Sequence, residues 1–334
     1  MNIRNNNGFH SNKTTLDRLI VVTGAAGFIG SHTTDELLSL GHRVVGVDDL
    51  STGRIGNLGE SMRNDRFEFV KADVSGPEMM DWLCQRYQPA AIIHLAGLVS
   101  VVAAQENPGR NYRLNLHATQ QVAEAARSCG VPRVVFASSA ATYGNTLALP
   151  VSEETPTRPE GLYGSCKLAS EHLLQGYASS FDLEVVCLRY FNVYGSRQTG
   201  DSPYAGVISK FVEGFSSGKG VTVFGDGRQS RDFIHVRDVA RANALAATVP
   251  LELRTLVANV CTGRQQSLNE VLSVFGNLFP HAPAPRRETA RRGEILHSCG
   301  DPAIAKRHLG FQARTTLDEG LRHLIDHSGI SISA

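Results

Sequence analysis

Residues 18–30 read RLIVVTGAAGFIG, and this stretch decides the fold. The apolar run 18–24 is typical of a buried strand, and it ends directly in a glycine. Glycines at positions 24, 27 and 30 allow a tight turn, a close backbone approach to a pyrophosphate, and close packing of the next helix on the strand. The spacing predicts that helix over 28–41, and its N-terminus would point at the phosphates. The combination predicts a dinucleotide site.

An acidic residue follows at the place that such a site requires. Asp48 ends the next apolar run, 42–49, and lies 18 positions beyond Gly30. A carboxylate there can accept hydrogen bonds from both ribose hydroxyls of NAD and would repel a 2′-phosphate. No arginine follows directly, since the sequence continues DDLSTG, so NAD is favoured over NADP. Asp49 is a second candidate for this role, with a solvated turn residue as the alternative.

The first half of the chain alternates strand and helix patterns. The apolar runs predict strands over 18–24, 42–49, 66–74, 90–97, 133–140 and 183–193. Helical spacing is found over 28–41, 111–130 and 161–181. Strands that alternate with helices imply parallel crossovers, so the predicted fold class is α/β, a Rossmann doubly wound parallel sheet.

The pattern becomes irregular after about residue 195, where turn signals and Pro/Arg-rich stretches appear. We therefore expect a flexible tail over 1–17, an NAD-binding Rossmann domain over 18–190, and a smaller C-terminal lobe over 191–334 that mainly binds substrate. Part of 231–262 is expected to pack back on the Rossmann domain. The cleft should lie at the carboxyl ends of the strands.

Composition excludes several other classes of protein. The formal net charge of the 334 residues is +1, which gives no electrostatic case for a nucleic-acid or membrane partner. No apolar run of membrane-spanning length occurs, and the polar start lacks a signal peptide's apolar segment. The six cysteines form no C-x-x-C pair, so we expect reduced thiols, a cytoplasmic location and no metal site.

The glycine spacing G-x-x-G-x-x-G after Thr23 resembles the extended short-chain dehydrogenase/reductase superfamily. Within it the chain is similar to the NAD-dependent epimerase/dehydratase family, and in particular to UDP-N-acetylglucosamine/UDP-glucose 4-epimerases. The resemblance covers nearly the whole chain from about residue 18. The matching stretches include VDDLSTG (47–53), HLAG (94–97), SSAATYG (138–144), YGSCK (163–167), RYFNVYG (189–195), GDGRQSRDFIHVRDVARA (225–242) and RRGE (291–294).

The resemblance implies a set of cofactor-binding residues from several strand ends. These are Gly24, Ala26, Gly27, Phe28, Ile29, Gly30, Asp48, Asp49, Leu50, Ser51, Thr52, Gly53, Asp73, Val74, Leu95, Ala96, Gly97, Tyr163, Lys167 and Tyr190. Asp73 and Val74 would flank the adenine, and the stretch 95–97 would line the cofactor's path.

Four residues are the candidates for catalysis. Tyr163 and Lys167 are four apart in a helical segment, so they share a face, and the ammonium is expected to lower the phenol's pKa together with the charged nicotinamide. Such a phenol can take a proton from a sugar hydroxyl as hydride leaves the carbon. The resemblance adds Ser139 as a hydrogen-bond partner of that hydroxyl. Ser138 is the substitute for it, with a helper that bonds cofactor or backbone as the alternative.

The residues after Ser139 indicate which reaction of the family is expected. Dehydratases of this branch carry an Asp-Glu pair there, whereas this chain has Ala140 and Ala141. Enzymes for UDP-glucuronate hold the carboxylate with basic or hydroxyl residues after the fourth strand, and the stretch GLVSVVAAQENP (97–108) has no Arg or Lys. The remaining scheme is 4-epimerisation, in which a 4-keto sugar turns about its diphosphate and takes the hydride back on the other face.

The resemblance also implies how a UDP-sugar would be held. Asn192 resembles the residue that bonds the diphosphate, Arg231 and one of Arg291 and Arg292 would clamp it, and Glu294 would accept from the ribose. The remaining substrate candidates are Ser100, Ser139, Tyr204, Ala205, Val207 and Phe224. Ser298 aligns with a pocket position that is Tyr in some UDP-glucose enzymes, so its small side chain favours an N-acetylhexosamine.

Three alternatives stay open from the sequence. The chain could be a UDP-glucose or UDP-glucuronate 4-epimerase, or a reductase that consumes NADPH. It could also be a non-catalytic NAD-binding protein, although such proteins tend to lose the Tyr–Lys pair that is intact here. The helices expected over 104–129 and 161–180 pair into a four-helix bundle in homodimers of this family, so a homodimer is the expected assembly.

Overall fold

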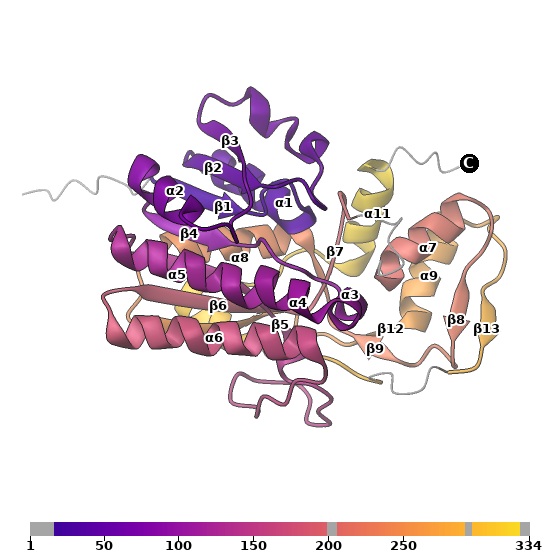
Figure 1. Ribbon diagram of the computed structural model, residues 1–334. Coiled ribbons are helices and arrows are strands. Elements are labelled where there is room, and N and C mark those ends of the chain that lie inside the picture. Colours follow the sequence, from indigo (N-terminus) through magenta and orange to yellow (C-terminus); the bar gives the residue numbers. More distant parts are fainter. Residues whose placement is uncertain (1–16, 199–205, 291–295, 328–334) are drawn as a thin grey trace, which may run out of the picture.

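The computed structural model describes residues 17–198, 206–290 and 296–327, and it is built on a seven-stranded sheet (Figure 1). The strand order is β11-β6-β5-β4-β1-β2-β3, and every neighbouring pair is parallel. The strands are β1 (Leu19–Thr23), β2 (Arg43–Asp48), β3 (Phe67–Lys71), β4 (Ala91–His94), β5 (Arg133–Ser139), β6 (Glu184–Tyr190) and β11 (Thr255–Val260). The predicted α/β doubly wound parallel sheet is confirmed.

Helices cover both faces of this sheet. One face carries α2 (Met79–Tyr87), α5 (Ala118–Ser128) and α6 (Leu162–Ser180), and the other carries α1 (Phe28–Ser39), α8 (Val236–Thr248) and α10 (Ala303–Leu309). Consecutive strand residues point to opposite faces, so Val21 packs in one core while Ile20 and Val22 pack in the other. Burial on both faces explains why β1 and β4 are almost continuously apolar, whereas the edge strand β3, FEFVK, alternates and is partly exposed.

The order of the strands reverses between β1 and β4. From β1 the chain adds β2 and β3 on one side, and from β4 it adds β5, β6 and β11 on the other. In an open parallel sheet a crevice forms at the carboxyl ends of the strands on either side of such a reversal. The fold therefore places a ligand-binding crevice next to the glycine turn that follows β1.

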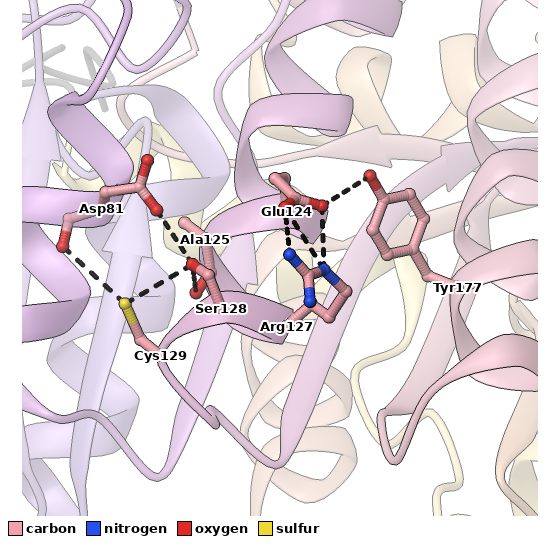
Figure 2. Close-up of polar contacts among 7 residues, drawn as sticks. All are labelled: Asp81, Glu124, Ala125, Arg127, Ser128, Cys129 and Tyr177. Atoms are coloured by element: carbon pink, nitrogen blue, oxygen red, sulfur yellow. Dashed lines mark hydrogen bonds and ion pairs between the residues drawn. The ribbon is translucent and has the colours of Figure 1, made fainter.

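The helix expected over 111–130 is longer and less regular than its spacing suggested. It begins with α3 (Val101–Glu106) and α4 (Pro108–Asn111), continues through a π-helical segment, η3 (Tyr112–His117), and ends as α5. Figure 2 shows how the end of α5 is held between its neighbours: Ser128 donates to Asp81 of α2 at 3.0 Å, and Tyr177 of α6 donates to Glu124 at 3.1 Å. These contacts fix the helices that cover this face.

The remaining chain forms a second, smaller layer of structure beyond the carboxyl edge of the sheet. Its short strands pair as β7 (Asn192–Tyr194) with β10 (Phe233–His235), β8 (Thr222–Phe224) with β13 (Arg286–Glu288), and β9 (Ser230–Arg231) with β12 (Gln266–Ser267). Its helices are α7 (Val207–Ser216), α9 (Leu268–Leu278) and α11 (Leu317–His327). They share a core that includes Phe211, Phe275 and Leu321.

Two features of this half correct or extend the sequence interpretation. The run 183–193 was expected to be one strand, but β6 ends at Tyr190 and Asn192 begins β7 in another sheet, because its N–H donates to Asp232 O at 3.1 Å. Between these short strands the chain returns to the large sheet: α8 packs beside α1, and β11 adds the seventh strand next to β6. Within the described ranges, no helix is both long and apolar enough to cross a membrane.

Candidate active site

A cavity of about 480 Å³ lies at the carboxyl ends of the central strands. Its wall runs from the glycine turn after β1, past the ends of β2, β4 and β5, to β7, β10 and the start of α7. The cavity thus lies between the large sheet and the smaller layer, at the reversal of strand order where such folds bind ligands.

The glycine turn at one end of the cavity leaves a cradle that side chains would fill. Gly24 has φ +70°, and a Cβ atom there would come within 2.7 Å of the Ala96 backbone nitrogen. A Cβ atom on Gly30 would lie 2.0 Å from the carbonyl oxygen of Gly24. Helix α1 begins directly after Gly27, so its free N–H groups face the cradle. The shape and the N–H groups fit the pyrophosphate of a dinucleotide.

Asp48 lies at the cavity wall where β2 ends, and its carboxylate is held in place by backbone donors. Ala26 N–H donates to Oδ2 at 3.0 Å and Leu50 N–H donates to Oδ1 at 2.8 Å. Burial raises the pKa of Asp48, and the backbone hydrogen bonds partly offset this rise. A Cβ atom on Gly53 would meet the same carboxylate at 2.7 Å, so a glycine is required there. A fixed carboxylate at this point suits the ribose of NAD.

Asp73 lies in the turn after β3 and is organised by a separate set of contacts. Its Oδ1 accepts from the Ser75 N–H at 2.8 Å, and its Oδ2 forms an ion pair with Arg113 Nη1 at 2.9 Å. Burial by itself raises the pKa of Asp73, but the hydrogen bonds from Ser75 and Arg113 outweigh it and hold the pKa below its usual value. Asp73, Val74 and Ser75 all line the cavity.

Tyr163, Lys167 and Ser139 meet at the cavity wall. Tyr163 is half-buried at the start of α6, and the Lys167 ammonium lies 6.0 Å from its ring centroid. The Lys167 side chain is buried, and its Nζ donates to the carbonyl oxygen of Ala137 at 2.9 Å. Burial lowers the pKa of Lys167 to about 8. The spacing of four residues therefore places phenol and ammonium on one helix face beside the end of β5.

Without the cofactor, the Tyr163 phenol does not have the lowered pKa that was expected from Lys167 and the charged nicotinamide together, and with NAD bound that expectation stays a prediction. Burial raises the pKa of Tyr163 above its usual value, and the side-chain hydrogen bond with Ser139 is what lowers it. The physical reason is that the phenol lies in a partly enclosed cavity, where burial disfavours the charged phenolate.

Ser138 and Ser139 take different directions although they are adjacent. The Ser139 hydroxyl accepts from the Ala141 N–H at 3.1 Å and faces the cavity with Tyr163. Ser138 is 3% exposed, and its hydroxyl donates a hydrogen bond to the fully buried Glu171. Ser138, the expected substitute for Ser139, also lines the cavity, but its hydroxyl bonds to a carboxylate rather than to the cofactor or backbone of the alternative interpretation.

The cavity wall contains most of the predicted cofactor residues. Those on the wall are Gly24, Gly27, Phe28, Ile29, Gly30, Asp48, Asp49, Ser51, Thr52, Asp73, Val74, Leu95, Ala96, Gly97, Tyr163, Lys167 and Tyr190. Those behind it are Ala26, Leu50 and Gly53, which instead contact or adjoin the Asp48 carboxylate.

The predicted substrate residues are less completely gathered. Ser139, Asn192 and Val207 line the cavity. Ser100, Phe224, Arg231 and Ser298 do not: Ser100 caps α3, and Arg231 Nη1 donates to backbone carbonyls of Ser230 and Leu296. Tyr204, Ala205, Arg291, Arg292 and Glu294 lie outside the described residues.

The structure adds wall residues that the sequence analysis missed. They are Val47, Ala72, Ser75, Val99, Leu114, Ala118, Ala137, Phe191, Val193, Tyr194, Gln198, Gly206, Ile208 and Phe233. A sequence signal existed for Phe191, Val193 and Tyr194, because they belong to the quoted RYFNVYG stretch. Phe233 also belongs to a quoted stretch, 225–242, but nothing in that stretch showed that the pairing of β10 with β7 brings it to the cavity. In the parts of the chain that the structure describes, no group of three or more His, Cys, Asp or Glu residues is arranged to hold a metal ion.

Comparison with known proteins places these features in context. The family model described as the NAD dependent epimerase/dehydratase family matches residues 20–260. The UDP-glucose 4-epimerase of Mycolicibacterium smegmatis is 37% identical over 307 residues, 92% of this chain and 97% of that protein.

Two solved structures are similar over almost the whole chain. The UDP-N-acetylglucosamine 4-epimerase of Methanobrevibacter ruminantium, in complex with UDP-N-acetylmuramic acid, has a TM-score of 0.86 and 31% identity over 93% of this chain and 99% of that one. The UDP-glucose 4-epimerase of Thermus thermophilus, in complex with NAD, has a TM-score of 0.82 and 32% identity over 94% of this chain and 100% of that one.

Proposed function

The chain belongs to the NAD-dependent epimerase/dehydratase family, and we propose that it interconverts a UDP-hexose with its C4 epimer. NAD is the cofactor, as the family and its NAD-bound members indicate, and the prediction from Asp48 is confirmed. The observation that carries the proposal is the meeting of Tyr163, Lys167 and Ser139 at one wall of the cavity whose other end is the glycine cradle.

In this proposal Tyr163 and Ser139, which meet beside the end of β5, handle the proton of the sugar hydroxyl. Tyr163 takes the proton from the sugar O4 and later returns it, and Ser139 bonds to the same hydroxyl. Bound NAD supplies the hydride acceptor and donor for C4, and its positive charge would oppose the rise that burial gives the Tyr163 pKa. Asn192 on the cavity wall holds the diphosphate while the sugar ring turns.

The segment after Ser139 supports epimerisation rather than dehydration. Ala140 and Ala141 occupy the positions where an acid and a base would be needed to expel water. Neither carries a group that can exchange a proton, and the short helical turn that they begin points its Ala141 N–H at Ser139. The segment 140–141 therefore adds no second proton-transfer group beside Tyr163, which fits an epimerase rather than a dehydratase.

The preferred substrate in this proposal is UDP-N-acetylglucosamine or UDP-N-acetylgalactosamine. Support comes from Ser298, which is half-buried and whose N–H donates to the Ser230 carbonyl at 3.1 Å. Ser298 does not line the described cavity, so this support rests on its alignment with a pocket position that is Tyr in some UDP-glucose enzymes, where a serine would leave more space; Cys299 beside it is also small. The similar structure from Methanobrevibacter ruminantium, which is named a UDP-N-acetylglucosamine 4-epimerase, also supports this preference.

UDP-glucose is the second candidate substrate, because the Mycolicibacterium relative at 37% identity is named for it. The test is an NMR assay with UDP-N-acetylglucosamine, UDP-glucose and UDP-glucuronate side by side, without added NADPH. We expect turnover of the N-acetylated sugar, and Ser298→Tyr should abolish it while UDP-glucose is spared. Equal loss of both sugars, or of neither, would contradict the assignment of Ser298. A requirement for added NADPH would point to a reductase instead.

The same proposal assigns the binding of NAD and of the UDP-sugar to different parts of the chain. Residues 18–190, with α8 and β11 from the 231–262 stretch, would bind NAD, and the rest of 191–334 would mainly bind the UDP-sugar. The expected tail, 1–17, lies almost entirely outside the described residues. The cytoplasmic location stays a prediction, consistent with the six cysteines being unbridged.

A homodimer is also proposed, through the helices that lead into α5 and α6. Apolar side chains are exposed there: Val101 and Val102 are each 45% exposed, Tyr112 is 56% exposed and Leu162 is 42% exposed. Burying such a surface against a second copy would remove it from water. Sedimentation equilibrium at micromolar concentration should give twice the monomer mass, and a monomer would contradict the proposal.

A further inference from the structure

One face of α6 holds the last three residues of β5. The helix residues Tyr163, Lys167 and Glu171 are spaced by four, so they follow one another along the same face. Each contacts a different residue at the end of the strand. The three pairs are Tyr163 with the Ser139 side chain, Lys167 with the Ala137 carbonyl, and Glu171 with the Ser138 hydroxyl. The first two pairs belong to the candidate active site, and the third has no role in it so far.

Glu171 is completely buried and is held on its other side by Arg189 of β6. Arg189 Nε donates to Oε1 at 3.0 Å, and Nη2 contacts Oε2 at 2.6 Å, so the pair is bidentate. Burial alone would lower the pKa of Arg189, but the hydrogen bonds and charge of Glu171 keep it above its usual value. In the sheet, Arg189 is the register partner of Ser138. Helix, strand and neighbouring strand are therefore joined at one carboxylate.

The contacts continue to the segment that follows Ser139. The Arg189 guanidinium lies 4.7 Å from the ring centroid of Tyr143, and the Tyr143 hydroxyl donates to Asn259 Oδ1 at 2.7 Å. Asn259 is in turn the register partner of Arg189 on β11. Both ends of the stretch from Ser138 to Tyr143 are thus attached to the same buried arginine.

Stability alone gives a weak reason for such an arrangement. Removing two charges from water is costly, and well-packed apolar residues in the same place are often at least as stabilising. A bidentate pair does impose a direction, because its hydrogen bonds tolerate little displacement. We propose that Glu171 is a positioning residue for the 4-epimerisation: with Arg189 it fixes Ser138, and thereby aims the adjacent Ser139 and the Tyr163 phenol at the reacting hydroxyl. This inference rests on the proposed function.

The same two strands supply a matched control at their other end. There Arg133 of β5 and Glu184 of β6 are register partners, and Arg133 Nη2 lies 2.6 Å from Glu184 Oε2. This pair has the same charges and also involves β6, but it joins β6 to β5 rather than to α6, its Glu184 side chain is 37% exposed, and neither residue lines the cavity. If an ion pair at β6 only stabilises the fold, its loss should lower the free energy of unfolding and leave kcat nearly unchanged in both variants, whereas a positioning role should lower kcat only at Glu171.

The test compares Glu171→Gln with Glu184→Gln in the full-length protein, using the UDP-hexose that the wild type converts. Glu171→Gln should lower kcat by about 100-fold, the scale expected when reacting groups are displaced by about 1 Å, while KM stays within about twofold. Glu184→Gln should keep kcat within about twofold. Glu171→Asp, which retains the charge, should recover part of the lost kcat. Equal losses in the two Gln variants would overturn the inference.

A second variant covers the case in which Glu171→Gln fails to fold, since it leaves Arg189 buried without its partner. The double variant Glu171→Leu with Arg189→Met removes both charges and keeps the volume, so it should unfold cooperatively in a thermal scan and still have a low kcat. A folded double variant with wild-type kcat would overturn the inference and leave the proposed function intact. If the wild type converts no UDP-hexose, the proposed function falls, and the inference falls with it.

Discussion

The Nζ atom of Lys167 donates to the carbonyl oxygen of Ala137 at 2.9 Å, which joins the middle of the Tyr–Lys helix to the strand that ends in Ser139. The lysine is 4% exposed, and its ring neighbours are Phe136, at 4.8 Å from Nζ to the centroid, and Tyr163 at 6.0 Å. A buried ammonium with one carbonyl acceptor among the described groups loses its proton more easily than a solvated one. The pH at which Lys167 loses its proton should therefore affect the pH dependence of the reaction.

We predict that kcat/KM falls on the alkaline side as pH rises through about 8. Burial lowers the pKa of Lys167 to about 8, so above that pH the group becomes neutral. In the proposed reaction its charge, together with that of bound NAD, would favour the phenolate that Tyr163 forms when it takes the sugar proton. The measurement is kcat/KM for the UDP-hexose between pH 6 and pH 10 at saturating NAD. A profile that stays flat to pH 9.5 would show that the protonated form of Lys167 is not required.

Removing the phenolic hydroxyl should abolish most of the activity without emptying the cofactor site. Tyr163→Phe is expected to lower kcat by roughly 10²–10⁴-fold, the usual contribution of a general acid–base group. NAD affinity, measured by titration of the protein, should change little, since the ring itself remains. Tyr177→Phe is the control on the same helix, because that hydroxyl donates to Glu124 away from the cavity and kcat should be retained. Comparable kcat values for the two variants would exclude Tyr163 as the base.

The sequence predicted the central sheet well because its strands carry local signals. The strands β1 and β4 begin as continuous apolar runs, as does β5 after Arg133, and Gly30 is required by a contact within the glycine turn itself. The end of β6 was misplaced by the same logic, because the run 183–193 is largely apolar and only the Asn192 contact with Asp232 shows that the chain changes sheets.

The second half of the cavity depends on contacts between distant residues. Phe233 reaches the cavity wall because β10 pairs with β7, some forty residues earlier in the chain. A local sequence pattern does not predict a pairing between strands so far apart. The direction of the Tyr163 pKa was also beyond the sequence, because it depends on how deeply the ring is enclosed. The motifs therefore located the candidate reacting groups, whereas their neighbours and the depth of their burial could be known only from the packed structure.

Adding one methyl group to the glycine cradle should disable the protein. In Gly30→Ala the new Cβ would lie 2.0 Å from the Gly24 carbonyl oxygen and 2.9 Å from the Ala25 Cα, and both are backbone atoms that cannot rotate away. We expect a loss of about 3 kcal/mol in the free energy of unfolding, at the upper end of the cost of overpacking, together with loss of NAD binding. Urea unfolding and NAD titration check this. Gly56→Ala, whose Cβ would meet nothing within 4 Å, should match the wild type in both measurements.

His94 should account for part of the protein's sensitivity to acid. It ends β4, where its Nδ1 lies 2.8 Å from Thr23 Oγ1 and its ring stacks on Phe136 with centroids 6.0 Å apart. Burial, with a smaller effect from the Lys167 charge, lowers the pKa of His94 to about 3. Between about pH 6.5 and pH 3 the unfolded chain therefore binds a proton at this residue that the folded protein does not. Acidification through that window lowers the free energy of unfolding.

Replacing the ring by an amide should reduce this dependence on pH. His94→Asn keeps an acceptor near Thr23 but loses the stacked ring, so at pH 7.5 it should destabilise the protein by about 1–3 kcal/mol. The further drop in the free energy of unfolding between pH 7.5 and pH 5, measured by urea denaturation, should be smaller than in the wild type. Some drop should remain, because burial also lowers the pKa values of His32 and His235 to about 4. His281→Asn, at an exposed position, should lose as much stability on acidification as the wild type, and an identical loss in His94→Asn would show that His94 does not titrate with unfolding.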